Sequence, residues 1–455
     1  MKSKAKNEVQ RTQISKITAG GKVTTKGQAD ASRVNIRGFV DIIRDQKSIQ
    51  FVIIRDATGK VQVTVFKPEK PEIAAIFETL MVESVVSVTG SVVAAPNVKL
   101  GGIEIIPDSV EVLSTAKVSP IDEKSAVDLQ MDYRWLDLRD PKKRACFQIQ
   151  TLVKKAMFDY FTDNGFTYLD TPKLSSANAE GGSEVFEVKY FDQKAYLTQS
   201  PQFYKQMAMA AGFEKYFEFC ACYRAEKSFT SRHATEFVAL DVELAYIDDH
   251  HDVMDVEENM IKYVLAQTEK TCGKIMKDVL GIDFKAQTAK FPRIKLLDAY
   301  DLLEKEKGYK VPRATKGDLD PEGERLLGDI AREKYGSDFI FITDYPVAGR
   351  VFYSARHEDD GTSPTLTKTF DLLYKGVEIT SGGQREHNPE KLKHNMRDKG
   401  IDPKTMQTYI SFFEYGCPPH GGFALGFGRF FAKLLDIPSI KDATYLFRGP
   451  DRLTP

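Results

Sequence analysis

Residues 223–237, YRAEKSFTSRHATEF, form a charged segment between two apolar runs, FEFCACY before it and VALDVELAYI after it. The apolar runs are typical of buried strands. Two strands joined by such a loop can present guanidinium groups to phosphates while an aromatic ring stacks on a base. The candidate residues for these roles are Arg224, Glu226, Arg232, His233 and Phe237. Taken alone, the segment could also be a solvated loop.

The sequence around this loop predicts one large α+β domain. A helix is expected from about 145 to 164, where Asn164-Gly165 is a good left-handed cap. Its apolar face would comprise Ile149, Leu152, Val153, Ala156, Met157, Tyr160 and Phe161. Farther along the chain, strand-like runs alternate with glycine-rich turns, and a more polar helical insertion is expected at about 295–335.

A β-rich module precedes this domain. Its strand-like runs are VNIRGFVDII, IQFVIIR and VQVTVF, then, after a helical stretch at 71–80, VVSVTGSVV and IEII with VEV. Three strands, a helix and two strands is the order of an OB-fold barrel. Such barrels commonly bind single-stranded nucleic acid by stacking bases on surface aromatics in a basic groove. The alternative is that Phe39, Phe51 and Phe66 are all core residues.

A polar connector, KVSPIDEKSAVDLQMD, separates the two modules. We therefore divide the chain into a basic N-terminal tail (1–15), an OB-fold domain (16–116), a connector (117–140) and a second domain (141–455).

Composition is that of a soluble globular protein, with 42% hydrophobic and 28% charged residues among 455. Residues 1–116 carry 16 Lys and Arg against 12 Asp and Glu, which suggests a polyanionic partner, although a basic tail is also a common solubilising feature. No apolar run reaches the roughly 18 residues of a membrane span, and no apolar segment makes a signal peptide of the N-terminal stretch. The sequence predicts a cytoplasmic protein without a membrane partner.

The charged segment at 223–237 belongs to neither common phosphate-binding class, because GxGxxG and GxxxxGK[ST] are absent. It resembles signature motif 2 of the class II aminoacyl-tRNA synthetases (fRxE, a loop, then RHxxEF). Motif 1 of that class resembles the predicted helix ending in GFTYLDTP, with Pro172 at a dimer interface. Motif 3 resembles GGFALGFGRFFAKLL, with Arg429.

Further segments are similar to the archaeal and eukaryotic type of aspartyl-tRNA synthetase: EGGSEVF, TQSPQFYKQM, FDLLYKGVEITSGGQREH, PPHGG and the terminal RLTP. The resemblance implies an OB-fold barrel followed by a class II catalytic domain, an antiparallel sheet flanked by helices. It also implies a homodimer that joins L-aspartate to tRNA(Asp), using ATP and Mg²⁺ through an aspartyl-adenylate.

Residue roles at the ATP end follow from the same resemblance. Arg224 would contact the α-phosphate and the substrate carboxylate, and Arg429 would cover one adenine face and reach the γ-phosphate; these two are the catalytic candidates. Glu226 and Phe237 would meet the adenine, Arg232 and His233 the outer phosphates, and Gly426 would also line the ATP site. Glu378 and Ser381 match magnesium ligands, and both offer the oxygen atoms that a hard cation prefers.

The aspartate side chain would be held by Lys205 and Arg385, a point charge and a planar fork. The resemblance places Glu180 and Ser183 near the α-amino group, and it adds Gln202, Arg224 and Ser381 to the pocket. Asparaginyl enzymes of similar fold usually carry Glu where Lys205 stands. Without the resemblance, Lys205 could equally be a solvated lysine in the first turn of a helix begun by Ser200-Pro201.

In the barrel, Phe51 and Gln62 match positions that stack on and hydrogen-bond the central anticodon base, and Arg37 is expected to meet the backbone or a neighbouring base. The sequence departs from the family at Gly428, where motif 3 normally has Glu, and at Gly449, where an acid is also usual. Phe39 replaces the Trp or His that is linked to the choice of tRNA. Two alternatives remain: a dual-specificity enzyme that also charges tRNA(Asn), and a non-aminoacylating RNA-binding paralogue.

Overall fold

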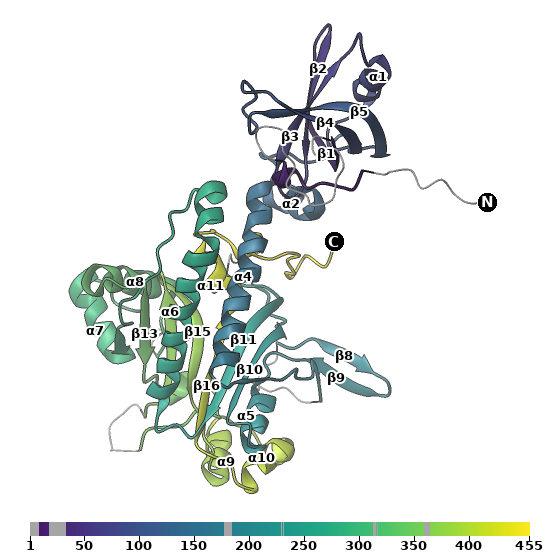
Figure 1. Cartoon of the computed structure of the whole chain (residues 1–455). Coiled ribbons are helices and arrows are strands. Elements are labelled where there is room, and N and C mark those ends of the chain that lie inside the picture. Colours follow the sequence, from purple (N-terminus) through teal and green to yellow (C-terminus); the bar gives the residue numbers. More distant parts are fainter. Residues whose placement is uncertain are drawn as a thin grey trace. The chain divides into compact units, whose positions relative to one another are not determined.

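The computed structural model describes residues 9–17, 33–176, 184–228, 230, 232–312, 315, 317–358 and 365–455. The chain divides into two compact units, Met1–Glu123 and Lys124–Pro455 (Figure 1). The division falls inside the polar connector that the sequence indicates. Among the described residues, no helix combines the length and apolar character needed to cross a bilayer.

The first unit is a closed five-stranded barrel in the order β1-β2-β3-β5-β4. Its elements are β1 (Arg33–Asp45), β2 (Ile49–Arg55), β3 (Lys60–Phe66), α1 (Pro71–Thr79), β4 (Val85–Ala94) and β5 (Ile103–Ser114), after a 3-10 turn at Ile14–Lys16. Valine and isoleucine side chains fill the barrel, and Phe77 of α1 packs among them. This confirms the predicted OB-fold. Phe39, Phe51 and Phe66 lie outside this core, so the alternative that all three are core residues is wrong.

The second unit is built on an eight-stranded sheet in the order β12-β13-β14-β15-β16-β11-β10-β6. Its strands are β6 (Thr167–Tyr168), β10 (Lys215–Tyr223), β11 (Glu236–Ala245), β12 (Arg293–Lys295), β13 (Phe339–Thr343), β14 (Thr369–Tyr374), β15 (Val377–Gln384) and β16 (His420–Gly426). The pairs β12–β13 and β10–β6 are parallel and the interior pairs are antiparallel. The predicted antiparallel sheet flanked by helices is confirmed, and parallel pairs are added at both edges because each edge strand reaches its neighbour through a helical crossover.

Helices α4 (Pro141–Asp163), α6 (His250–Ile275) and α11 (Phe427–Leu434) pack against one face of this sheet (Figure 1). Helix α4 begins earlier than predicted, because the Asp140 side chain caps it and Pro141 occupies its first position. Leu152 is 38% exposed and does not join the buried face of α4, which corrects the predicted set.

The opposite face is covered near β13 by α7 (Leu296–Lys307) and α8 (Pro321–Tyr335). Strand alternation divides β13 between the two faces: Phe339 and Phe341 join the core under α4 and α6, and Ile340 and Ile342 join the core under α7 and α8. The same alternation separates Asp241 and Glu243 of β11, and the paired Asp371 and Ser381 of β14 and β15, from the core under α4 and α6.

The remaining elements are α2 (Val127–Asp132), α3 (Arg134–Asp137), a small sheet of β7 (Leu174–Ser175), β9 (Gln193–Leu197) and β8 (Glu187–Tyr190), α5 (Gln202–Ala210), a π-helical turn (Met276–Leu280), 3-10 turns at Val347–Gly349 and Pro403–Met406, α9 (Pro389–Asp398), α10 (Gln407–Glu414) and α12 (Ile440–Ala443).

Candidate active site and nucleic-acid surface

Strands β10 and β11 hold the charged loop with which the sequence argument begins. At its base, the amide of Arg224 donates to the carbonyl of Thr235 at 2.9 Å. The Arg224 guanidinium lies 5.4 Å from the ring centroid of Phe237 and 3.6 Å from the Glu226 carboxylate. The hairpin therefore places a cation against the aromatic ring predicted to stack on adenine.

Arg232 and Arg429 add positive charge to this end of the sheet. Nε of Arg429 donates to the carbonyl of Arg232 at 3.3 Å, and its Nη1 donates to the carbonyl of Glu378 at 3.1 Å. Burial, followed by the nearby charge of Arg429, lowers the pKa of His233, so its ring is neutral at pH 7. Together, Arg224, Arg232 and Arg429 form a cationic surface suited to a polyphosphate.

Glu378 and Ser381, the predicted magnesium ligands, lie on β15 beside Asp371 of β14. Burial, followed by the negative charge of Asp371, raises the pKa of Glu378 to about 7. The Glu378 side chain is still 40% exposed, so it opens onto solvent. Arg350 lies at the same corner, where its Nη1 donates to Asp371 at 3.0 Å and to the Ser381 hydroxyl at 3.1 Å. Mutually repelling carboxylates beside a hydroxyl fit a hard cation, which would compete with Arg350.

Lys205 and Arg385 meet in a buried cluster of charged side chains, the candidate aspartate pocket. Only 1% of the Lys205 side chain is exposed, and its Nζ lies 3.0 Å from Asp241 Oδ1 and 3.3 Å from Glu243 Oε2. Nε of Arg385 donates to Glu243 Oε1 at 3.0 Å, and Nη2 donates to the carbonyl of Gly422 at 3.0 Å. The alternative of a solvated lysine is therefore wrong, since both cations contact one buried carboxylate.

The two acids of this pocket differ in their electrostatics. Burial raises the pKa of Asp241 although Lys205 opposes it, and its Oδ2 is buried without a hydrogen bond among the described residues. Burial acts on Glu243 too, but Arg385 and Lys205 together hold its pKa below the usual range. Glu243 therefore stays ionised, while Asp241 keeps one acceptor oxygen unused.

A chain of neutral groups borders the cations. Nε2 of Gln202 donates to Gln206 Oε1 at 2.8 Å, and the Tyr409 hydroxyl donates to the same oxygen at 2.8 Å. Gln206 Nε2 lies 3.0 Å from Nε2 of His420, and burial lowers the pKa of His420 to about 4. The predicted pocket residue Gln202 is thus buried and fixed in a network that carries no net charge at neutral pH.

Two predicted residues, Glu180 and Ser183, lie outside the described part of the chain. Gly426 is the N-cap of α11. A Cβ added at Gly428, in the first turn of that helix, would meet no atom within 4 Å beyond its chain neighbours and the backbone of its own helix. Arg429 is held here by backbone carbonyls, so its position does not depend on an acid at residue 428.

Several residues of the site were not predicted. Asp241 and Glu243 could have been found, because two acids at alternate positions of the apolar run VALDVELAYI must share one face of a strand. Glu324 of α8, whose Oε2 lies 2.9 Å from Arg232 Nη1, carries no such signal. Neither does Arg350, which reaches the site from a loop.

The outward face of the barrel carries the residues predicted to read an anticodon. Phe51 is half-buried, Arg37 is exposed, and Nε2 of Gln62 donates to Thr64 and to Glu104, each at 3.1 Å. Phe51 pairs with Thr64 across β2 and β3, and Ile53 pairs with Gln62 two residues farther along, on the same face of the two strands. Phe51 and Gln62 therefore lie on one surface, as joint contact with a base requires.

Comparison with known proteins agrees with both units. The family model for class II tRNA synthetases (D, K and N) matches residues 126–448, and that for the OB-fold nucleic acid binding domain matches residues 34–113. An Aeropyrum pernix protein named aspartate–tRNA(Asp/Asn) ligase is 40% identical, covering 95% of this chain and 98% of its own length. A Pyrococcus horikoshii protein named aspartate–tRNA(Asp) ligase is 39% identical, covering 94% and 97%.

Solved structures align over almost the whole chain. Asparaginyl-tRNA synthetase from Pyrococcus horikoshii, complexed with asparaginyl-adenylate, gives a TM-score of 0.85 at 32% identity, with coverage of 98% and 100%. Aspartyl-tRNA synthetase from Entamoeba histolytica gives 0.82 at 28% identity, with coverage of 98% and 93%. The family match over residues 126–448, together with the relatives at 40% and 39% identity, shows that the chain belongs to the class II tRNA synthetases of the D, K and N group.

Proposed function

We propose that this chain joins L-aspartate to tRNA(Asp) in an ATP-dependent reaction that passes through aspartyl-adenylate. The observation that carries the proposal is the meeting of Lys205 and Arg385 on Glu243 inside the catalytic unit. The similarity to aspartate–tRNA ligases at 40% and 39% identity supports it. The proposal includes a cytoplasmic location and a homodimer.

Recognition of aspartate rests on charge. The substrate side-chain carboxylate would share Lys205 and Arg385 with Glu243, and the unused Oδ2 of Asp241 is an acceptor for the α-ammonium group. Asparagine brings no second carboxylate, so the buried cations would face a neutral amide at a cost in desolvation. The fold itself does not make this distinction, because an asparaginyl enzyme aligns with a TM-score of 0.85.

Adenylate formation needs no general base. The α-carboxylate of the substrate is already ionised at neutral pH and attacks the α-phosphorus of ATP, with pyrophosphate as the leaving group. Arg224 would align that carboxylate with the phosphorus, and Arg232 and Arg429 would neutralise the charge that develops on the pyrophosphate. Phe237 offers the stacking face for adenine once its contact with Arg224 loosens.

Glu378, Ser381 and Asp371 would hold magnesium. The raised pKa of Glu378 supports this assignment, since a cation relieves the repulsion between the two carboxylates. When bound, magnesium supplies charge neutralisation at the phosphates of ATP. Arg350 donates to both Asp371 and Ser381 and so fixes the orientation of these two side chains.

The barrel is proposed to bind the anticodon through Phe51, Gln62 and Arg37, within a module spanning about 16–116. The dimer is proposed to form through motif 1, where Leu152 and Leu174 leave apolar surface 38% and 44% exposed. Sedimentation velocity of the full chain should then give the mass of two chains.

A second candidate is a dual-specificity enzyme that also charges tRNA(Asn) with aspartate. The relatives from Aeropyrum pernix and Thermus thermophilus carry the name aspartate–tRNA(Asp/Asn) ligase, each at 40% identity. Phe39, the position linked to this choice, lies under the Arg55 guanidinium at 4.9 Å. Transcripts of tRNA that differ only in the anticodon, charged side by side, separate the two candidates.

The decisive experiment is ATP–pyrophosphate exchange with each amino acid in turn. Aspartate should support exchange and asparagine should give little. Exchange with no amino acid would favour the non-aminoacylating paralogue, and exchange with asparagine alone would show that the pocket has been misread.

A further inference from the structure

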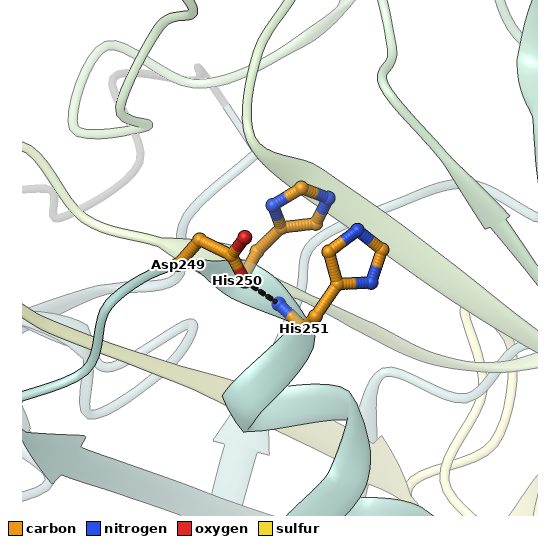
Figure 2. A group of neighbouring side chains, drawn as sticks. All are labelled: Asp249, His250 and His251. Carbon is orange, nitrogen blue, oxygen red and sulfur yellow. Dashed lines mark hydrogen bonds between the residues drawn. The ribbon is translucent and has the colours of Figure 1, made fainter.

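The start of α6 gathers two imidazole rings and a carboxylate at the end of β11 opposite the charged loop. His250 and His251 are the first residues of the helix, and Asp249 caps it by accepting from the His251 amide at 2.7 Å. One ring nitrogen from each histidine and one oxygen of Asp249 all lie within 4.8 Å of one another. Figure 2 shows the two rings side by side above the first turn, with the Asp249 carboxylate next to them.

His250 is buried without a hydrogen bond to its ring from any residue that the structure describes. His250 is 3% exposed, and neither its Nδ1 nor its Nε2 makes a hydrogen bond within the described residues. A buried imidazole usually forms at least one hydrogen bond, because water cannot reach it to replace the hydrogen bonds that it loses on burial. Both ring nitrogens of His250 are therefore available to a ligand.

Asp344, directly after β13, lies behind His250. Its Oδ1 is 3.7 Å from His250 Nε2 and 2.7 Å from Nε2 of His357. A metal-binding histidine commonly donates its second ring N–H to a carboxylate, which fixes the orientation of the ring. Asp344 is placed for that role if the ion takes His250 Nδ1.

The neighbouring cations have other partners. Arg293 Nη1 lies 3.3 Å from His251 Nδ1, but its Nη2 contacts Asp255 and lies 3.4 Å from Glu258. Arg293 can therefore stay in place when His251 turns toward an ion. Lys295 is 3.9 Å from Asp344 Oδ2, on the side away from the atom that faces His250.

We propose that Asp249, His250 and His251 bind a divalent transition-metal ion of the zinc class, with Asp344 as the positioning residue for His250. Two imidazoles and a carboxylate favour zinc-class ions over magnesium or calcium, which prefer oxygen ligands alone. Zinc bonds of about 2.0–2.1 Å separate tetrahedral ligands by about 3.4 Å, so the three groups, which lie within 4.8 Å of one another, need to close by up to about 1.4 Å. The ion would fasten the start of α6 to the end of β13.

The test uses the full chain, stripped with a chelator and titrated with Zn²⁺ and separately with Co²⁺. One ion per chain should bind, the cobalt form should show tetrahedral visible absorption without a thiolate charge-transfer band, and zinc should raise the unfolding temperature. His251→Gln should weaken binding at least about tenfold, and Asp344→Asn by roughly 10- to 100-fold. His394→Gln is the matched control, because His394 is 67% exposed on α9 and distant in sequence from the cluster.

His250→Gln serves as a further variant only if circular dichroism shows it folded; His251 is half-buried and provides the main comparison. Failure to retain one ion would overturn the proposal. So would equal zinc affinity in His251→Gln and the natural chain, or a thiolate band that assigns the ion to cysteine. Displacement of the ion by magnesium would also count against it, since it would indicate a site for hard cations.

Discussion

The effect of replacing Lys205 is decided by its burial. Its ammonium lies among Asp241, Glu243 and the carbonyl of Phe423, with 1% of the side chain exposed. Lys205→Glu would place a third carboxylate beside two buried ones and would strain the fold as well as the substrate site. Lys205→Met keeps most of the volume and removes only the charge.

For Lys205→Met we expect the KM for aspartate in pyrophosphate exchange to rise on the order of 100-fold, because a buried charged partner of the substrate is lost. The KM for ATP should change little. Lys194→Met is the control, since Lys194 is 72% exposed on β9. An unchanged KM for aspartate in folded Lys205→Met would remove this residue from the pocket.

Glu378→Gln removes a charge and almost no volume. We expect adenylate formation at ordinary magnesium concentration to fall by about two orders of magnitude, because the phosphate charge is then less well neutralised. We expect the affinity for tRNA to stay unchanged. Exchange rates measured across a magnesium titration test this, and identical curves for the variant and the natural chain would exclude Glu378 from the metal site.

At the scale of the element, the first turn of α11 tests how far a family motif can be carried over. Gly428 has room for a side chain, and Arg429 is already held by the carbonyls of Arg232 and Glu378. An acid in a first helical turn also interacts favourably with the helix dipole. Because backbone carbonyls hold Arg429 without an acid at residue 428, the glycine is compatible with an active enzyme.

For Gly428→Glu we expect a modest fall in the KM for ATP and a stability gain of about 0.5–1 kcal/mol from replacing a helical glycine. Gly428→Ala should give the stability gain without the change in KM. Loss of exchange in Gly428→Glu alone would show that the site has been rebuilt around the glycine.

Helix α6 contains a buried acid that makes stability depend on pH. Burial raises the pKa of Glu257 from an ordinary value of 4.5 to about 8. Between these pH values the unfolded chain releases a proton that the folded chain keeps, so this group lowers stability progressively as the pH rises from about 4.5 to about 8.

Glu257→Gln should therefore raise the unfolding temperature most above about pH 8 and change it little below about pH 4.5. Thermal unfolding across this range measures the effect. Glu258→Gln is the matched neighbour: Glu258 pairs with Lys262 at 2.7 Å, so its loss should destabilise the protein at neutral pH. A Glu257→Gln curve parallel to that of the natural chain would contradict the assignment.

At the scale of the whole molecule, a substitution in one unit should impair the function of that unit and leave the function of the other unchanged. Phe51→Ala removes a stacking surface on the barrel, typically worth about 1–3 kcal/mol per base, and leaves the catalytic unit untouched. We expect weaker tRNA binding and aminoacylation with unchanged tRNA-independent exchange. Phe66→Ala, at a ring 40% exposed on the neighbouring strand, is the comparison. A parallel loss of exchange in Phe51→Ala would mean that Phe51 supports the fold.

Much of this molecule follows from sequence, because local patterns reflect local forces. Short strand-like runs predict the barrel strands, and Asn164-Gly165 ends α4 where predicted, with Gly165 at φ 78°. The loop at 223–237 is recognisable by its resemblance to motif 2, since its charges taken alone would also suit a solvated loop. These signals need no knowledge of distant contacts.

Tertiary structure decided the rest. The parallel edges of the sheet, the burial of Lys205, and the arrival of Arg350 and Glu324 at the site all depend on which distant segments meet. The sequence does not distinguish a lysine that is surrounded by water from one that is surrounded by two carboxylates. Only folding sets its dielectric surroundings and its partners, and these fix the charge balance of the pocket.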